Sequence, residues 1–476
     1  MDRIDPRRLA DWAGGRLVPA GAGGPVGPDV VRDSRDVTPG ALFVAIPGER
    51  VDGHDFVAVA AAAGAGAALV DHEVAADLPQ IVVPDTVGGL SALARSVVTD
   101  AKGRGLIVVG VTGSSGKTST KDLIAQVLEA AGPTVAPAGS FNNEIGAPLT
   151  ACRLDAATRF LVTEMGARGL GHVAWLCTIT PPDIGLVLNV GTAHLGEFGS
   201  RDGIAQAKGE LVEAVTADGW AVLNADDPRV AAMAARTRGR VALFSAVGEP
   251  TAPPGGAALR VWASEVRADA LQRYSFTLNA EGFATAAVPV HLRVLGEHGV
   301  ANALAAATVG LCAGLPAAGV AAALSEATTR SRWRMELGQR ADGLAVLNDA
   351  YNANPDSMAK ALQTVVRLRR PGGRVIAVLG DMLELGDDAA QAHRAAGRLA
   401  ADLGVDELLA VGDFGPDLVA GFAPGGRPAR YWAAKPGAAQ ALESVVGPAD
   451  VVLVKASRGV GLETLAEGLL KEGTDR

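Results

Sequence analysis

The first 85 residues contain short apolar runs separated by polar and glycine-containing turns. Residues 41–46, 67–70 and 80–83 are brief, mainly apolar runs of the kind that forms buried strands. The alanine-rich segment 54–66, between the first two runs, predicts a helix. We therefore expect a small α/β domain over residues 1–85.

From residue 86 onward, apolar runs alternate regularly with amphipathic segments. The uninterrupted run LIVVGV at 106–111 predicts a strand buried on both faces of a parallel sheet. After the break TAPPGG at 251–256, polar and apolar positions alternate, which predicts a small antiparallel subsheet. The central domain is expected to span residues 86–335. Its other predicted strands are 160–163, 184–190, 220–224 and 240–245, and its predicted helices are 90–101, 118–131, 204–215 and 299–313.

A third alternating block fills residues 336–476. Apolar runs predict strands near 345–348, 374–380, 407–412 and 450–456, and the segment APGGRPAR at 423–430 predicts a surface loop. Strand–helix alternation in both larger blocks favours doubly wound parallel sheets. The fold class expected from the pattern is therefore α/β, in three domains.

Composition and charge restrict the kinds of partner. Of 476 residues, 49% are hydrophobic and 20% are charged, which excludes intrinsic disorder. The net charge of −9 provides no broad cationic surface for nucleic acid or an anionic membrane. The N-terminal segment lacks the apolar stretch of a signal peptide, and the three cysteines form no closely spaced pair. We expect a cytoplasmic protein with no nucleic-acid or membrane partner.

The strongest chemical signal is GVTGSSGKTST at residues 110–120, between an apolar strand and an amphipathic helix. Small residues in such a turn let backbone N–H groups converge on phosphate oxygens, and the helix N-terminus adds its dipole. Lys117 is placed to reach the β- and γ-phosphates, and the Thr118 hydroxyl is placed to bind Mg²⁺. The strict GxxxxGK[ST] pattern fails by one residue, because Val111 stands where it requires glycine. The strand–loop–helix context nevertheless predicts a nucleotide-binding loop.

Polar residues also stand where predicted strands end. Glu164 directly follows the strand 160–163, and His194 lies four residues beyond the strand 184–190. In open α/β sheets, ligands bind outside the carboxyl ends of the strands. Taken alone, each residue is more typical of a capping or solvated position than of a ligand. Beside a phosphate loop on the same sheet edge, the pattern instead favours a carboxylate and an imidazole that complete metal coordination.

Three further segments are compatible with either a binding role or a structural one. Lys208 has the position of a solvated helix lysine. The loop DAYNANPDS at 349–357 is rich in hydrogen-bonding side chains, yet a plain turn would have the same composition. In the segment KASRGVG at 455–461, Lys455 and Arg458 stand beside glycines at a predicted strand end. This arrangement is compatible with an anion site or with an ordinary connection between a strand and a helix.

Taken together, these segments resemble the Mur ligase family. The shifted loop GVTGSSGKT is similar to the family's ATP loop, and FNNEIGAPLT, DAYNANPDSM, LGDMLELG and VKASRGVGLE are similar to its other loops, as are DSR and DGH near the N-terminus. The resemblance implies a UDP-sugar-binding domain at 1–85, a central ATPase domain at 86–335 and a Rossmann-like domain at 336–476 that closes over the site. The third block has no GxGxxG, so its similarity is one of fold and not of dinucleotide binding.

Within the family, these loops resemble those of the members that join D-alanyl-D-alanine to UDP-N-acetylmuramoyl-tripeptide. In the implied reaction, ATP phosphorylates the terminal carboxylate of the tripeptide, and the dipeptide amine then displaces phosphate from the acyl phosphate. The phosphorylation supplies a leaving group, because an amine does not displace oxide from a carboxylate. The resemblance also implies two Mg²⁺ ions and a monomeric enzyme.

The resemblance further implies roles for individual residues. The catalytic set would be Lys117, Glu164, His194 and Lys208. ATP would be held by Gly113, Ser114, Ser115, Gly116, Lys117, Thr118, Ser119, Asn302, Arg334 and Asp349. One Mg²⁺ would be bound by Thr118 and Glu164, and a second ion would be bound by His194. Lys208 would also bind a cation if carbamylation converts it into an anionic oxygen ligand. The UDP group would face Ser34, Arg35, Asp52 and His54, and the muramoyl peptide and dipeptide would face Asn142, Asn143, Tyr351, Asn352, Asn354, Ser357, Ser457 and Arg458.

Three positions depart from the family pattern. Ser140 replaces an asparagine, Ala456 replaces a glycine, and SRWRM at 331–335 replaces a turn with more glycine. The competing interpretations are a sister Mur ligase that adds another amino acid, a folylpolyglutamate synthetase-like ligase and, from another class, a P-loop switch that couples ATP hydrolysis to conformation. Dependence of ATP hydrolysis on a small-molecule acceptor separates the ligases from the switch.

Overall fold

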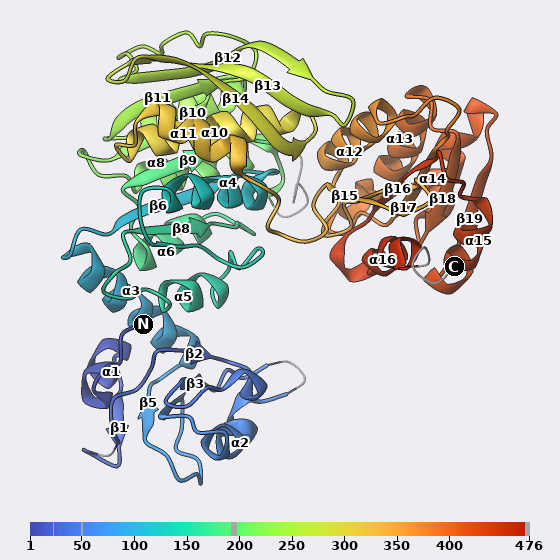
Figure 1. Ribbon diagram of the computed structural model, residues 1–476. Coiled ribbons are helices and arrows are strands. Elements are labelled where there is room, and N and C mark those ends of the chain that lie inside the picture. Colours follow the sequence, from blue (N-terminus) through green and yellow to red (C-terminus); the bar gives the residue numbers. More distant parts are fainter. Residues whose placement is uncertain (22, 49–50, 192–197, 472–476) are drawn as a thin grey trace.

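Three lobes, each built on its own β-sheet, follow one another along the chain (Figure 1). The computed structural model describes residues 1–21, 23–48, 51–191 and 198–471. In Figure 1 the N-terminal lobe is blue, the central lobe runs from lighter blue through green to yellow, and the C-terminal lobe is orange to red. None of the described helices is both long enough and apolar enough to cross a membrane.

The N-terminal lobe is a five-stranded sheet in the order β1-β5-β4-β3-β2, with β1 antiparallel to β5 and the other neighbours parallel. The three predicted strands are present as β3, β4 and β5. The predicted helix is shorter than expected, because residues 53–56 form a 3₁₀ turn and Gly64, with φ +97°, follows the end of α2. The elements are α1 (Pro6–Ala13), β1 (Arg16–Val18), β2 (Val30–Val31), η1 (Ser34–Asp36), β3 (Leu42–Val44), η2 (Gly53–Phe56), α2 (Val57–Ala62), β4 (Ala67–Val70) and β5 (Gln80–Val82).

A nine-stranded sheet forms the central lobe, in the order β14-β13-β12-β11-β10-β9-β6-β8-β7. Neighbours from β7 to β12 are parallel, whereas β12, β13 and β14 form the antiparallel subsheet, which continues the same sheet through β11. The strands are β6 (Ile107–Thr112), β7 (Thr134–Val135), β8 (Phe160–Glu164), β9 (Ile184–Val187), β10 (Trp220–Asn224), β11 (Arg240–Ser245), β12 (Leu259–Ala268), β13 (Arg273–Gly282) and β14 (Ala286–Leu295). The helices are α3 (Thr86–Lys102), α4 (Lys117–Glu129), α5 (Gly146–Ala151), α6 (His172–Ile179), α8 (Arg201–Glu213), α9 (Pro228–Ala231), α10 (His298–Cys312) and α11 (Ala317–Glu326).

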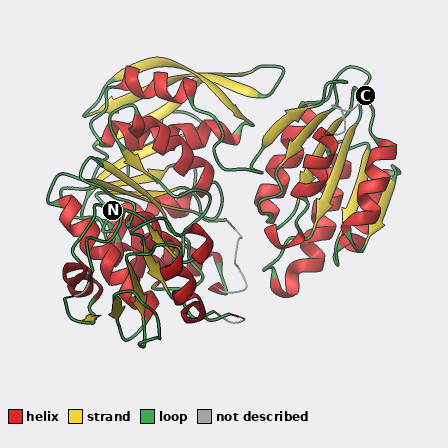
Figure 2. Cartoon of the chain, turned by 60° about the horizontal axis from the view of Figure 1, so that its bottom comes forward, coloured by secondary structure: helices red, strands yellow, loops and turns green. Residues whose placement is uncertain are grey.

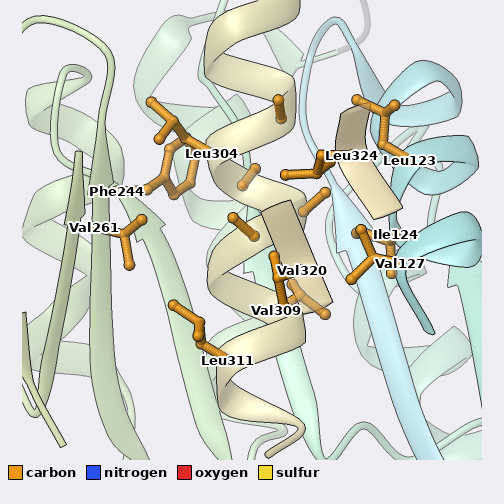
Figure 3. Close-up of a cluster of buried hydrophobic side chains, with 14 of the residues drawn as sticks. Leu123, Ile124, Val127, Phe244, Val261, Leu304, Val309, Leu311, Val320 and Leu324 are labelled. Carbon is orange, nitrogen blue, oxygen red and sulfur yellow. The ribbon is translucent and has the colours of Figure 1, made fainter. Parts of the chain in front are cut away.

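Helix α10 lies inside the central core (Figure 3). Its apolar side chains, such as Leu304, contact Phe244 and Val261 of the sheet on one side, and helix α4 covers the other side. The two helices approach closely at Gly310, where a Cβ would lie only 2.8 Å from Val127 Cγ1. This packing fixes the start of α4, and with it the phosphate loop, relative to the sheet.

The C-terminal lobe is a six-stranded sheet in the order β15-β16-β20-β17-β18-β19, with helices on both faces (Figure 2). On β16, Leu347 packs in a cluster with α12 and α13, whereas the adjacent Val346 packs in a second cluster with α15 and α16. Alternate side chains of one strand thus enter opposite layers, as a doubly wound sheet requires. The strands are β15 (Glu336–Gln339), β16 (Ala345–Asn348), β17 (Val375–Gly380), β18 (Glu407–Val411), β19 (Ala429–Trp432) and β20 (Val451–Lys455), and the helices are α12 (Pro355–Arg367), α13 (Ala389–Asp402), α14 (Gly415–Phe422), α15 (Lys435–Val445) and α16 (Glu463–Lys471).

The surface loop predicted at 423–430 is only partly correct. Residues 423–425 form a 3₁₀ turn, and the edge strand β19 already begins at Ala429, where it pairs in parallel with β18. This strand is short and half exposed, so its sequence lacks the apolar run that reveals a buried strand.

The connection between the central and C-terminal lobes is anchored on helix α4. Gln126 exchanges two hydrogen bonds with the backbone of Thr328, of 2.9 and 3.0 Å. Further along, Trp333 and Met335 have left-handed φ angles of +59° and +50°. Glycine adopts left-handed backbone more easily than other residues do. This gives a physical reason why the resemblance implies a turn with more glycine at the position of SRWRM.

Candidate active site

A cavity of about 680 Å³ lies between the central and C-terminal lobes. Residues from the phosphate loop, the end of β8, helices α8 and α10 and the loop before α12 line it together. Of the predicted site residues, its walls contain Ser114, Ser115, Gly116, Lys117, Thr118, Ser119, Asn142, Asn143, Glu164, Lys208, Asn302, Arg334, Asp349, Tyr351, Asn352, Asn354 and Ser357. Residues that are far apart in sequence therefore meet in one space, whereas Gly113, Ser457 and Arg458 are not in its walls.

The phosphate loop is held in shape by a neighbouring strand end. Strand β6 ends at Thr112 and α4 begins at Lys117, and Gly116 turns between them with φ +83°. Ser115 N donates to Asn189 Oδ1 (2.9 Å), and Asn189 Nδ2 donates back to Ser115 O (3.0 Å). The sequence analysis did not single out Asn189, although a polar residue at the carboxyl end of a predicted strand was the available signal.

Glu164 lies at the centre of an oxygen-rich group beside this loop. Thr118 Oγ1 donates to Glu164 Oε2 (2.7 Å), and Asn142 Nδ2 donates to Glu164 Oε1 (2.8 Å). The Glu164 side chain is buried in the wall, where a carboxylate needs positive or donor partners. A hydroxyl and a carboxylate next to a phosphate loop form a set of hard oxygen ligands that suits Mg²⁺. His194, the predicted ligand of a second ion, lies outside the described residues.

Two lysines share the same wall. Lys117 Nζ donates to the carbonyl of Gly113 (2.7 Å); burial lowers its pKa, although nearby Glu164 acts in the opposite direction. Lys208, on α8, is only 5% exposed and is thus not a solvated helix lysine. Burial and the positive charge of Lys117 lower the pKa of Lys208 to about 7. Much of Lys208 is therefore an uncharged, nucleophilic amine near neutral pH.

The predicted adenosine residues come from both lobes. Asn302, on α10, faces the phosphate loop, since a Cβ on Gly116 would lie 3.1 Å from Asn302 Oδ1. The carboxylate of Asp349 is fixed by the buried Lys455, whose Nζ donates to Oδ2 (2.5 Å), and by the backbone N–H of Met335, which donates to Oδ1 (3.0 Å). Lys455 therefore has a positioning role, and each Asp349 oxygen keeps a second lone pair for a hydroxyl donor.

Tyr351 connects the C-terminal lobe with the loop at 140–143. Ser140 Oγ donates to the Tyr351 hydroxyl (2.5 Å), and Arg334 Nη2 donates to Ser140 Oγ (3.3 Å). The Arg334 guanidinium also lies over the Tyr351 ring, 4.2 Å from its centroid. Ser140, one of the departures from the family pattern, thus takes part in a contact between the two lobes.

Asn354 and Ser357 combine a structural role with a place in the cavity wall. The Asn354 side chain accepts from Ser357 N (2.9 Å), and Ser357 Oγ accepts from Asn354 N (3.0 Å), which makes a reciprocal cap at the start of α12. By contrast, Ser457 Oγ is buried, accepting from Leu383 N (3.0 Å) and donating to Ala353 O (3.4 Å). Ser457 therefore ties two loops of the C-terminal lobe together behind the cavity.

The residues predicted to face UDP lie in the N-terminal lobe, away from this cavity. Ser34 and Arg35 belong to a short 3₁₀ turn capped by Asp33, which also pairs with the exposed Arg35 side chain. His54 is buried, and its Nδ1 lies 2.7 Å from Asp52 Oδ1. His54 Nδ1 donates to the Asp52 carboxylate, and this hydrogen bond orients the His54 ring.

The same lobe brings potential metal ligands of His54, Asp71 and His72 within 4.8 Å of one another. However, the two imidazole rings stack, with centroids 4.4 Å apart and planes inclined by 22°, so their in-plane lone pairs do not converge. His54 Nε2 also accepts a hydrogen bond from the Asp71 backbone (3.1 Å). These three side chains form a hydrogen-bonded network and not a preformed metal centre.

His298 is a cavity residue that the sequence analysis did not identify. It is the first residue of α10, one turn before Asn302. Burial lowers its pKa to about 4, and the positive charge of Lys360 contributes. The ring is therefore neutral at physiological pH.

We expect His298 to make the unfolding free energy depend on pH. Its pKa lies below the ordinary value of 6.5, so between pH 6.5 and about 4 the folded state binds fewer protons than the unfolded state. The resulting stability is complete above pH 6.5 and is lost as the pH falls towards 4, by up to about 3 kcal/mol. Urea unfolding at several pH values should show a larger acid loss for the wild type than for His298→Gln, and parallel pH profiles would contradict this assignment.

A three-lobed chain with a phosphate loop in the middle lobe and a cavity shared with the third lobe has the architecture of an ATP-loop amide ligase. In sequence, residues 30–97 match the "Mur ligase family, catalytic domain", residues 111–310 the "Mur ligase middle domain" and residues 333–458 the "Mur ligase, glutamate ligase domain". The chain belongs to the Mur ligase family.

Relatives within the family are similar over nearly their whole length. The UDP-N-acetylmuramoyl-tripeptide–D-alanyl-D-alanine ligase of Mycobacterium leprae is 44% identical over 93% of both chains, and that of Escherichia coli is 36% identical over 94% of both. The crystal structure of MurF from Acinetobacter baumannii matches with a TM-score of 0.86 and 30% identity over 99% of both chains. MurF ligase from Thermotoga maritima, solved in complex with ADP, matches with a TM-score of 0.76 and 28% identity, covering 93% of this chain and 97% of that one.

Proposed function

We propose that this chain is an ATP-dependent ligase that joins D-alanyl-D-alanine to UDP-N-acetylmuramoyl-tripeptide and so makes the UDP-muramoyl-pentapeptide precursor of peptidoglycan. The observation that carries the proposal is one cavity in which the phosphate loop and the Thr118–Glu164 pair face the Tyr351 loop of the C-terminal lobe. The names and the full-length similarity of the relatives support this choice of substrates. The same similarity favours it over a sister ligase or a folylpolyglutamate synthetase-like enzyme.

In this proposal, ATP lies along the phosphate loop, with residues 113–119 around its phosphates and Asn302, Arg334 and Asp349 towards the adenosine. The ADP complex of the Thermotoga maritima relative supports a nucleotide site in this fold. Thr118 and Glu164 would hold Mg²⁺, which offsets the negative charges of the phosphates and the reacting carboxylate when bound. Lys117 would leave the Gly113 carbonyl and donate to the transferred phosphoryl group.

Lys208 is suited to carbamylation because it is buried in the cavity wall and partly uncharged. Its neutral amine would attack CO₂ to form an N–C bond and release one proton, and the product is an anionic oxygen group. That group, together with His194, would complete a second cation site. A free ammonium beside Lys117 could not do so, since like charges repel.

The remaining substrate groups are assigned by lobe. We place the UDP group against Ser34, Arg35, Asp52 and His54 of the N-terminal domain (residues 1–85), and the muramoyl peptide against Asn142 and Asn143 of the central domain (86–335). The C-terminal domain (336–476) would bring Tyr351, Asn352, Asn354 and Ser357 to the dipeptide. Closure of this domain over the cavity would exclude water, which otherwise hydrolyses the acyl phosphate. We further propose that the enzyme acts as a monomer in the cytoplasm.

Phosphate release from ATP and Mg²⁺ tests this proposal. Release should require both UDP-N-acetylmuramoyl-tripeptide and D-alanyl-D-alanine, because the first prepares the acyl phosphate and the second discharges it. Release that needs neither compound would instead support the ATP-driven switch. Turnover only with a single amino acid as acceptor would identify a sister ligase.

A further inference from the structure

We infer that Glu384, in the loop after β17, binds the ammonium group of the incoming dipeptide and accepts its first proton. This inference rests on the ligase function proposed above. Glu384 lines the cavity from the C-terminal lobe, within the segment LGDMLELG at 379–386. No role was assigned to this residue by the sequence pattern.

The backbone of Glu384 is the first reason. Its φ of +63° lies in the left-handed region, which side chains with a Cβ rarely adopt. Such conformations persist where the surrounding structure enforces them, and they cluster at active sites. Here the segment just before Glu384 is anchored twice: the Asp381 carboxylate accepts from the N–H groups of Asp413 and Phe414 (both 2.9 Å), and Leu383 N donates to Ser457 Oγ (3.0 Å).

The distribution of carboxylates in the cavity is the second reason. The cavity wall contains the carboxylates of Glu144, Glu164, Asp349 and Glu384. Glu164 belongs to the proposed cation site, and Asp349 belongs to the proposed adenosine site. Glu144 belongs to the central lobe, beside the residues assigned to the muramoyl peptide. Glu384 is thus the carboxylate that the C-terminal lobe presents from the loop after β17, outside the proposed cation and adenosine sites.

The charge of the cavity favours such a group. The cavity wall also contains the cationic side chains of Lys117, Arg168, Arg334 and Lys360. These cations favour ATP and the acyl phosphate, but they repel the ammonium group of the dipeptide, since an α-amino group has a pKa of about 8 and is mostly protonated at neutral pH. A carboxylate in the cavity wall offsets this repulsion.

The proposed proton transfer balances. The ammonium gives one proton to the Glu384 carboxylate, and the freed lone pair forms the N–C bond with the acyl carbon. The C–O bond to phosphate then breaks with its electron pair on the departing phosphate, which takes the second proton from nitrogen. Glu384 finally returns its proton to solvent.

Steady-state kinetics of Glu384→Gln test the inference. The KM for D-alanyl-D-alanine should rise about 10- to 100-fold, while the KM values for ATP and the UDP-tripeptide stay unchanged. Inhibition by D-lactyl-D-alanine, which has a hydroxyl in place of the ammonium, should be equal in wild type and variant. An unchanged KM for the dipeptide, or an equal loss of affinity for the uncharged analogue, would overturn the assignment.

Two further variants separate binding from structure. Glu384→Gly removes the left-handed strain, so its thermal unfolding midpoint should be equal to or above that of the wild type, while its kinetic defect should match that of Glu384→Gln. Full activity of the glycine variant would show that the side chain has no role in the reaction. Asp387→Asn, which removes an exposed carboxylate in the same loop outside the cavity wall, should behave as the wild type. If the wild type itself makes no pentapeptide, the proposed ligase function fails, which is a distinct outcome.

Discussion

Replacing Lys117 with methionine should reduce kcat/KM for the ligase reaction by about 10³-fold or more, equivalent to about 4 kcal/mol of transition-state stabilisation. Lys117 begins α4, and its ammonium lies beside the phosphate loop with the Gly113 carbonyl as its present acceptor. In the first step a phosphoryl group passes from ATP to the carboxylate of the tripeptide, and the lysine charge offsets the negative charge of the phosphate oxygens. Methionine retains most of the length of lysine but none of its charge. Initial rates with saturating UDP-tripeptide and dipeptide measure the loss.

The matched control for this substitution is Lys102→Met. Lys102 is a partly exposed lysine at the end of α3 that pairs with Asp183 (2.8 Å), and it is not part of the cavity wall. Its substitution should leave kcat/KM within about twofold of the wild type, as is usual for surface changes. A Lys117→Met enzyme that retains more than a tenth of wild-type activity would place the phosphates elsewhere.

Replacing Lys208 with alanine should reduce activity by about 10²- to 10³-fold, and short carboxylic acids such as acetate should restore part of it. The reason is that the proposed carbamate places an anionic oxygen pair in the wall. Alanine leaves a space there that a free carboxylate can fill. Activity as a function of acetate concentration measures the rescue.

Lys208→Met provides the control for rescue. Methionine fills the same space with an apolar chain, so acetate should not restore its activity. If acetate stimulates neither variant, or if Lys208→Ala is as active as the wild type, Lys208 does not carry an anionic group. Carbon-13 NMR of the wild type with labelled bicarbonate supplies an independent readout, because a carbamate signal should be present and should disappear in both variants.

Much of the fold and the centre of the site could be predicted from local sequence. The run 106–111 and the following GSSGKT predicted a buried strand, a turn and a helix, because apolar periodicity and glycine placement are local properties. Glu164 could be predicted because a polar residue at the end of a buried strand stands out in the pattern. The family resemblance, now confirmed, supplied the substrates, which local pattern does not indicate.

Other parts of the site depend on contacts that the sequence does not show. Asn189 holds the phosphate loop from a separate strand, and Tyr351 meets Ser140 from another lobe. The burial of Lys208 likewise follows from how α8 packs, since a lysine in an amphipathic segment is usually solvated. The short edge strand at 429–432 has no apolar run of its own. These features require the tertiary arrangement, because each is defined by a partner far away along the chain.

The most direct test of the proposed function is the identity of the product. The protein is incubated with ATP, Mg²⁺ and UDP-N-acetylmuramoyl-tripeptide in the presence of equimolar D-alanyl-D-alanine and a mixture of single amino acids, and the UDP-linked products are identified by mass spectrometry. We expect one new species, the tripeptide extended by the dipeptide with loss of one water, formed together with one ADP and one phosphate. A product extended by a single amino acid, or ATP hydrolysis without any new UDP-linked species, would contradict the account.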